Sequence, residues 1–129
     1  MKLSLDFTDD RVPRIRGYDA DGIYIGDAHY RTTLLIWRQG VRHHWTTDPP
    51  TTVSAALLDE ALTTDMAMPE VMLIGTGQRQ HFPPPQALAP AIRQGIGVDI
   101  MDTAAACRTY NILVAEGRQA AALLMPPSL

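Results

Sequence analysis

Two short apolar runs lie on either side of a proline-rich loop in the second half of this 129-residue chain. The first run, Val71–Ile74, stops at Gly75-Thr76-Gly77, and the second, Ile96–Met101, ends at Asp102. Between them lies a loop with three consecutive prolines, followed by a stretch able to form a short helix. This order predicts two parallel strands joined by a right-handed crossover. Ligands of such units bind at the carboxyl ends of the strands, here near the glycines and Asp102.

The N-terminal part of the chain has the alternating pattern of antiparallel strands. Met1–Arg11 has period two and predicts an edge strand. Ile15–Trp45 predicts a meander of three or four antiparallel strands, with tight turns at Asp21-Gly22 and Gln39-Gly40. Within it, the apolar and β-branched run Tyr30–Trp37 is expected to form one long strand.

Two helices are expected on either side of the first apolar run. Ser54 is suited to cap a helix over Ala55–Leu62. Gln86–Gln94 predicts a short helix that Gly95 ends, and Pro90 within it indicates either a kink or a helix that begins there.

A third helix and a last strand complete the predicted order. Asp102 or Thr103 caps Ala104–Glu116, whose apolar residues occupy nearly every face, so this helix is expected to be largely buried. The apolar run Ala120–Met125 then predicts a buried strand. Strands alternating with helices place the chain in the α/β class.

Length, charge and cysteine content narrow the possible functions. The length suits one domain, residues 1–129. A formal net charge of −3, with no Lys/Arg run, argues against nucleic acid as the main partner. The lone Cys107 excludes an intrachain disulfide and fits a reducing compartment. With neither a signal-peptide core nor an apolar run of membrane-spanning length, we expect a cytoplasmic protein.

The second half of the chain resembles a known family. The stretches VMLIGTG and GVDIMDTAAACRTYNILVAEGRQAAALLMP are similar to the Mth-type domain of unknown function, which includes the adipogenesis-associated Mth-domain protein and mitochondrial complex I assembly factor three. The resemblance implies a three-layer α/β/α fold with a mixed central sheet and additional N-terminal strands. It supplies no catalytic residues. The positions that match the motif are Gly75, Thr76, Gly77, Asp102, Thr103, Thr109, Tyr110, Asn111, Glu116 and Arg118.

Gly75-Thr76-Gly77 has two interpretations. Its backbone N–H groups could cradle an anion, because glycine lets the backbone approach a phosphate closely. The spacing matches neither the dinucleotide fingerprint nor a Walker loop, and the prolines place the next helix some distance away. The alternative is an ordinary tight turn.

Three residues of the Ala104–Glu116 helix are further candidates. Cys107 is a possible nucleophile, but no histidine is near in sequence, so a buried inert thiol is the simpler interpretation. Arg108 and Asn111 bring polar groups to an apolar helix. Asn111 either lines the cleft beside Asp102 and Thr103 or satisfies the backbone of a neighbouring loop.

No metal ligand set is expected. His43 and His44 are adjacent, so on a strand their side chains would point to opposite faces. Asp19–Gly22 resembles the start of a calcium loop, but the position of the closing glutamate is Tyr30. Arg79 and His81 follow the glycines and could face an anion, although loop residues are often simply solvated.

These observations lead to two functional hypotheses. The first is a non-enzymatic protein-binding or assembly factor, by resemblance one that acts on a respiratory-complex assembly intermediate. Exposed N-terminal strands or the Arg79–Pro85 loop would meet the partner. The second is a small-molecule or anion binder, or an enzyme of unknown reaction, using a cleft with Gly75, Thr76, Gly77, Asp102, Thr103, Arg108 and Asn111. We expect no cofactor and no metal, and the oligomeric state is open.

Overall fold

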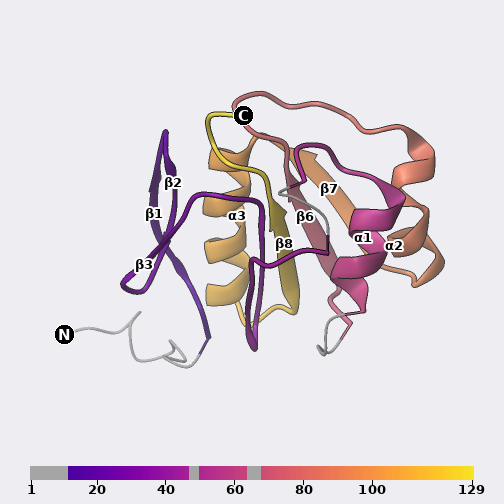
Figure 1. The fold of residues 1–129 in the computed structure, drawn as a ribbon. Coiled ribbons are helices and arrows are strands. Elements are labelled where there is room, and N and C mark those ends of the chain that lie inside the picture. Colours follow the sequence, from indigo (N-terminus) through magenta and orange to yellow (C-terminus); the bar gives the residue numbers. More distant parts are fainter. Residues whose placement is uncertain (1–11, 47–49, 64–67) are drawn as a thin grey trace.

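The computed structural model describes residues 12–46, 50–63 and 68–129 (Figure 1). The edge strand predicted for Met1–Arg11 lies outside these residues. Two sheets and three α-helices make up the described part of the chain.

The larger sheet has five strands in the order β5-β4-β8-β6-β7. β6 pairs in parallel with both of its neighbours, whereas β4 is antiparallel to β8 and to β5, so the sheet is mixed as predicted. The buried apolar strands β4, β8 and β6 form its middle, because central strands are covered on both faces, whereas the second apolar run forms the edge strand β7. The strand bounds are β4 Leu34–Trp37, β5 Gly40–Arg42, β6 Val71–Gly75, β7 Gly97–Met101 and β8 Ala120–Leu124.

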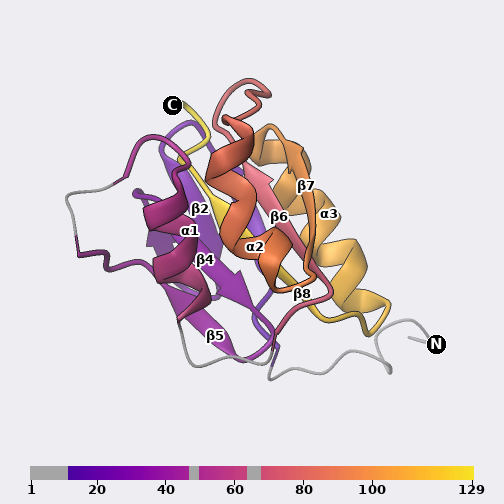
Figure 2. The same cartoon turned by 90° about the vertical axis from the view of Figure 1, so that its right-hand side faces the viewer.

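Helices cover both faces of this sheet, which gives the predicted three layers (Figure 2). On one face lie α1 (Ala55–Leu62), the 3-10 helix η2 (Pro85–Leu88) and α2 (Ala89–Arg93). On the other lies α3 (Thr103–Ala115). Alternate residues of each strand serve the two faces: in β4, Leu34 packs toward α3 and Leu35 toward α1 and α2.

The smaller sheet lies on the far side of α3 (Figure 1). It consists of β1 (Ile15–Asp19), β2 (Gly22–Ile25) and β3 (Ala28–Tyr30), all antiparallel. The Asn111 amide of α3 fixes β1, since its Oδ1 accepts a hydrogen bond from Ile15 N at 3.0 Å and its Nδ2 donates to Ile15 O at 2.7 Å. The Asn111 side chain thus makes the two backbone hydrogen bonds with Ile15 that a neighbouring strand would otherwise make.

The predicted N-terminal antiparallel meander is confirmed for β1–β3, but its extension to Trp45 is wrong. The segment forms five strands, and the run Tyr30–Trp37 breaks near Arg31 so that β4 and β5 join the central sheet. The reason is burial: all four residues of β4 are buried, whereas β1–β3 are only partly buried. A fully apolar strand is more stable in the middle of the molecule than in a half-exposed sheet.

The predicted helix starts are confirmed. Ser54 Oγ accepts from Leu57 N at 3.1 Å, and Asp102 Oδ1 accepts from Ala105 N at 2.8 Å. Pro90 falls in the first turn of α2, after η2, so the predicted Gln86–Gln94 helix is two short pieces and the later start is the correct alternative.

The expectation that the last helix is largely buried is correct for one face only. Only one stripe of α3 is buried, and Ile112 is 58% exposed on the opposite side. The small sheet, with strands of three to five residues, covers only part of the outer face of α3.

Asn111→Ala is expected to detach the small sheet locally. Losing both hydrogen bonds to Ile15 leaves two backbone groups without partners, which costs about 1–3 kcal/mol. Amide hydrogen exchange should accelerate in β1–β3 and stay slow in β6 and β8. Ile112→Ala, at the neighbouring exposed position, is the control and should leave both sheets unchanged; equal acceleration in both sheets of Asn111→Ala would contradict this role.

A junction of three strand ends with a hollow on either side

The carboxyl ends of β6, β7 and β8 meet at one edge of the sheet. Gly75, the last residue of β6, stands opposite Met101 of β7 and Leu124 of β8. The turn Gly75–Gly77, the start of α3 and the residue after β8 are therefore neighbours; the sequence predicts the first two to be close, and the position of β8 comes from the structure.

The Thr103 hydroxyl connects these three ends. It accepts a hydrogen bond from Gly77 N at 2.8 Å and donates one to Met125 O at 2.8 Å. The Thr103 backbone N–H also donates to Gly77 O at 2.9 Å. Thr103 is fully buried, so the hydroxyl satisfies two backbone groups that water does not reach.

Both glycines of the turn are required by close packing. A Cβ on Gly75 would lie 2.9 Å from Thr103 Cα, and a Cβ on Gly77 would lie 2.5 Å from Leu129 O. Gly77 also has φ +98°, a conformation that favours glycine. The two glycines that suggested an anion-binding turn are thus explained by the close packing where the three strand ends meet.

The N–H groups of this turn already have acceptors within the chain. Thr76 N donates to Met101 O at 2.9 Å, Gly77 N to Thr103 Oγ1, and Gln78 N to Leu129 O at 3.0 Å. An anion at this turn would have to displace one of these bonds. Anion binding here stays a prediction, and the geometry is that of a tight turn.

A hollow of about 340 Å³ opens beside the junction on the α3 side. Of the predicted cleft residues, only Gly77 and Asp102 line it. Arg108 lies next to it and donates from Nη1 to the Tyr18 hydroxyl at 2.6 Å. Asn111 instead holds Ile15, while Gly75 and Thr103 are buried. The lining residues are Tyr18, Asp19, Ala20, Gly77, Gln78, Asp102, Ala104 and Pro127.

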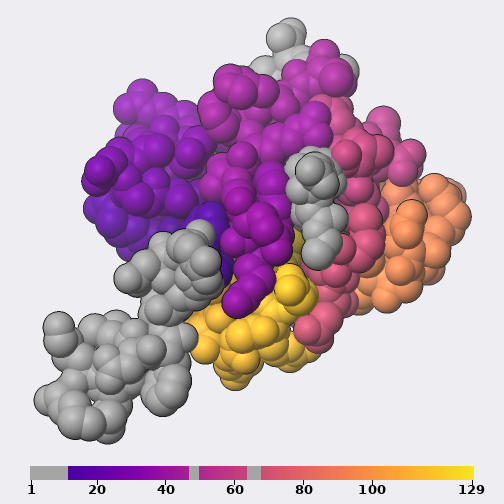
Figure 3. Space-filling view, turned by 90° about the horizontal axis from the view of Figure 1, so that it is seen from below, coloured from indigo at the N-terminus to yellow at the C-terminus, as the bar shows by residue number. Residues whose placement is uncertain are grey.

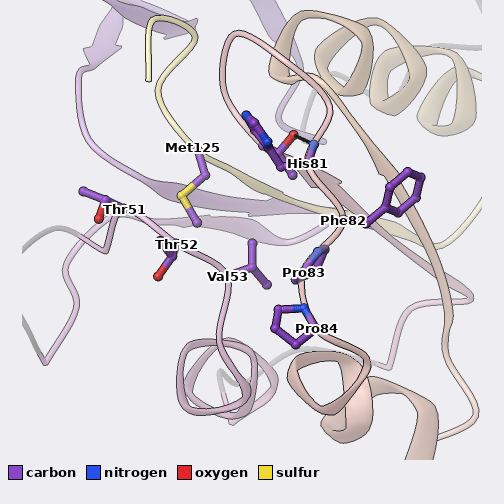
Figure 4. Close-up of a pocket in the computed structure, with 9 residues that line it drawn as sticks. Thr51, Thr52, Val53, His81, Phe82, Pro83, Pro84 and Met125 are labelled. Carbon is purple, nitrogen blue, oxygen red and sulfur yellow. Dashed lines mark hydrogen bonds between the residues drawn. The ribbon is translucent and has the colours of Figure 1, made fainter.

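A second hollow, of about 240 Å³, opens on the α1 side (Figure 4). Its lining is mostly apolar or small, and it contains Thr76 of the predicted set: Thr51, Thr52, Val53, Thr76, His81, Phe82, Pro83, Pro84 and Met125. The Thr76 hydroxyl organises the loop that forms one wall, since it donates to Arg79 O at 2.5 Å and accepts from His81 N at 3.0 Å. Gln80 Nε2 adds a bond to Ile100 O at 2.9 Å.

Phe82 is the residue of this loop that sequence reasoning missed. It is 74% exposed, and its ring points away from the other lining residues (Figure 4). The available signal was an aromatic residue directly before three prolines, in a loop too polar and too short to bury it.

Comparison with known proteins identifies the family. The sequence profile described as "Protein of unknown function (DUF498/DUF598)" matches residues 15–125. The chain belongs to this family. A crystal structure of a Bordetella parapertussis protein is 37% identical, covers 89% of this chain and 96% of its own, and superposes with a TM-score of 0.78. A Bordetella pertussis structure described as a Mth938-like domain has 31% identity, coverage of 93% and 89%, and a TM-score of 0.76.

Matches to curated proteins cover less of the chain. NADH dehydrogenase [ubiquinone] 1 alpha subcomplex assembly factor 3 of Xenopus tropicalis is 43% identical over 60 residues, 46% of this chain and 33% of the frog protein. The 13 kDa major membrane protein of Francisella tularensis is 40% identical over 57 residues, 44% of this chain and 46% of that protein. The chain therefore matches less than half the length of these relatives. Within its described residues, no helix is long and apolar enough to cross a membrane.

In this DUF498/DUF598 domain, the buried position predicted for Cys107 is confirmed. The thiol is 1% exposed, and burial raises its pKa to about 12, against a smaller lowering by Arg108. Thiolate is the reactive form of cysteine, so this group is poorly suited to act as a nucleophile at neutral pH.

The prediction that His43 and His44 lie on a strand is wrong for this domain. β5 ends at Arg42, so the two histidines are not on a strand, and their ring centroids lie 4.0 Å apart. Burial, and to a lesser extent the charge of His44, lowers the pKa of His43. Among the residues described, no group of three or more metal-binding side chains comes together.

Thr103→Val should destabilise the domain by about 2–4 kcal/mol, because it leaves the Gly77 N–H and the Met125 carbonyl buried without their partner. Chemical denaturation measures this loss. Thr103→Ser, which keeps the hydroxyl, is the matched control and should retain most of the stability. A Val variant as stable as the Ser variant would show that the hydroxyl is not what holds the junction.

Proposed function

We propose that this domain is a non-enzymatic protein-binding factor that assists assembly of a larger complex. The observation that carries the proposal is Phe82, a large apolar side chain 74% exposed on a loop with fixed geometry. The names of the relatives suggest a respiratory-complex intermediate as partner. In this role residues 1–129 act as one domain in the cytoplasm.

The structure of the Phe82 loop favours binding. The Thr76 hydroxyl and the Gln80 amide hold the loop from within, and three consecutive prolines follow Phe82 and restrict the backbone. A loop already fixed in one conformation loses little entropy when a partner binds. An exposed aromatic beside a shallow apolar hollow is typical of residues that supply most of the energy of an interface.

The site chemistry gives less support to catalysis. The thiol of Cys107 is buried, with a pKa near 12, and the N–H donors of the Gly75–Gly77 turn are occupied by the chain itself. These observations favour a surface that recognises a protein over a centre that transforms a substrate.

Phe82→Ser tests the proposal in a pull-down from the native organism with tagged protein. We expect the wild type to recover a stable partner and the variant to lose about tenfold or more of it, because removing an aromatic anchor costs about 2 kcal/mol or more. Ile112→Ser, on the exposed side of α3, is the matched control and should bind normally.

Two results would count against the binding role. One is a wild-type pull-down without any stable partner. The other is equal loss of the partner in Phe82→Ser and Ile112→Ser, which would point to a general effect of exposed apolar residues. Circular dichroism and melting curves of the three proteins verify that each is folded.

The second candidate is a small-molecule site in the hollow of about 340 Å³ on the α3 side. Two carboxylates, Asp19 and Asp102, line it, so its field suits a neutral or cationic ligand better than an anion. Under this function Phe82→Ser would leave ligand binding intact, since Phe82 belongs to the other hollow.

A further inference from the structure

A third hollow lies at the opposite end of the molecule from the junction. It has a volume of about 240 Å³ and is lined by Val12, Arg14, Arg38, Val114, Ala115, Glu116 and Gly117. The segments that contribute these residues are the start of the described chain, the turn between β4 and β5, and the end of α3 (Figures 1 and 3). None of these residues belongs to the two hollows beside the junction.

Two half-buried arginines, Arg14 and Arg38, face this hollow, and within the described residues neither has a hydrogen-bond or ion-pair partner. The Arg14 Nε is shielded from solvent and makes no hydrogen bond. In the part of the chain that the structure describes, neither Arg14 nor Arg38 has a carboxylate within 4.0 Å, although Glu116 lines the same hollow. A buried charged donor without an acceptor is costly, and such groups in folded proteins usually have a partner.

The guanidinium groups of Arg14 and Arg38 line the same hollow. The fully buried Tyr110 donates its hydroxyl to Pro13 O at 3.1 Å, and among the described residues neither arginine donates a hydrogen bond to it. Burial raises the pKa of Tyr110, while the charges of Arg38 and Arg14 both act to lower it, in agreement with the two arginines lining one hollow. Two like charges in one pocket repel each other unless an anion lies between them.

The charge of the pocket indicates which anion fits. Two arginines and Glu116 leave one positive charge uncompensated. A monoanion balances it, whereas a phosphate dianion would be in excess and would face both Glu116 and the carbonyl end of α3. The guanidinium fork also matches the two oxygens of a carboxylate.

We propose that Arg14 and Arg38 form a carboxylate-binding pocket. The carboxylate belongs either to an acidic side chain of a protein partner or to a small organic acid, and both sources present the same two oxygens. The pocket is a separate site and does not depend on binding at Phe82.

Nuclear magnetic resonance of the full chain tests the pocket directly. The Arg14 Nε–H signal is followed while chloride is replaced, at constant ionic strength, by acetate, by a blocked tri-glutamate peptide, or by inorganic phosphate. We expect a saturable shift of the Arg14 Nε–H signal with acetate. If the natural carboxylate belongs to a protein partner, the peptide should reach half-saturation at a concentration at least about tenfold lower than acetate. Acetate binding without this gain indicates a small acid as the source and still supports the pocket. A shift no larger than that of the exposed Arg93, or tighter binding of phosphate than of either carboxylate, overturns the proposal.

Arg14→Gln and Arg38→Gln should each abolish the acetate shifts of neighbouring backbone amides, and Arg93→Gln should leave them unchanged. The melting temperature in chloride buffer, without any carboxylate, shows whether a substitution also affects the stability of the fold. An unpartnered buried charge stabilises nothing, so Arg14→Gln should melt no lower than the wild type. If it melts several degrees lower in every buffer, Arg14 is a structural residue and the proposal fails. Arg38→Gln supplies the same binding test should Arg14→Gln not fold.

Discussion

The hydrogen bonds of the Thr103 hydroxyl are the constraint on which the rest of this domain depends. Gly77 and Met125 lie 26 positions before and 22 positions after Thr103, yet one buried oxygen contacts the backbone of both. The contact requires β6, β7 and β8 to end at the same level, and it requires α3 to begin directly at that edge. It also leaves no room for a side chain on Gly75, because the Thr103 backbone occupies that space.

The surfaces proposed for binding follow from this junction. Because Gly77 is fixed, the chain leaves the sheet in one direction, and Thr76 can bind the backbone of Arg79 and His81. That geometry presents Phe82 to solvent on one side of the sheet. On the other side, α3 runs down to the β4–β5 turn, where its last residues meet Arg14 and Arg38. The domain thus carries an apolar surface and a basic pocket at opposite ends of a rigid three-layer body.

Sequence reasoning succeeded where the signals are local. The strands Val71–Gly75 and Gly97–Met101 follow from continuous apolar runs, and the caps Ser54 and Asp102 follow from side chains that bond to their own helix start. Together with the family resemblance, these were enough for the three layers and for the meeting of strand ends.

Sequence reasoning failed where the role of a residue depends on a partner that is distant in the chain. The division of the meander depends on β8, with which β4 pairs through contacts such as Leu34 with Leu124. The role of Asn111 depends on Ile15, 96 positions away. Burial of α3 depends on how much of it the small sheet covers. Phe82 was missed although its position before three prolines was a signal, because that signal does not say which contacts the folded loop leaves to the ring.

Hydrogen exchange of the Gly77 amide in the wild-type protein tests the central claim most directly. If this N–H is bound to the buried Thr103 hydroxyl, it should exchange as slowly as the central strands, through unfolding of the whole domain, and its signal should not move when phosphate is added. Exchange at the rate of an exposed loop amide would contradict the account. So would a saturable shift with phosphate, because the donor would then be available to an anion and the turn would be a binding site instead of a structural junction.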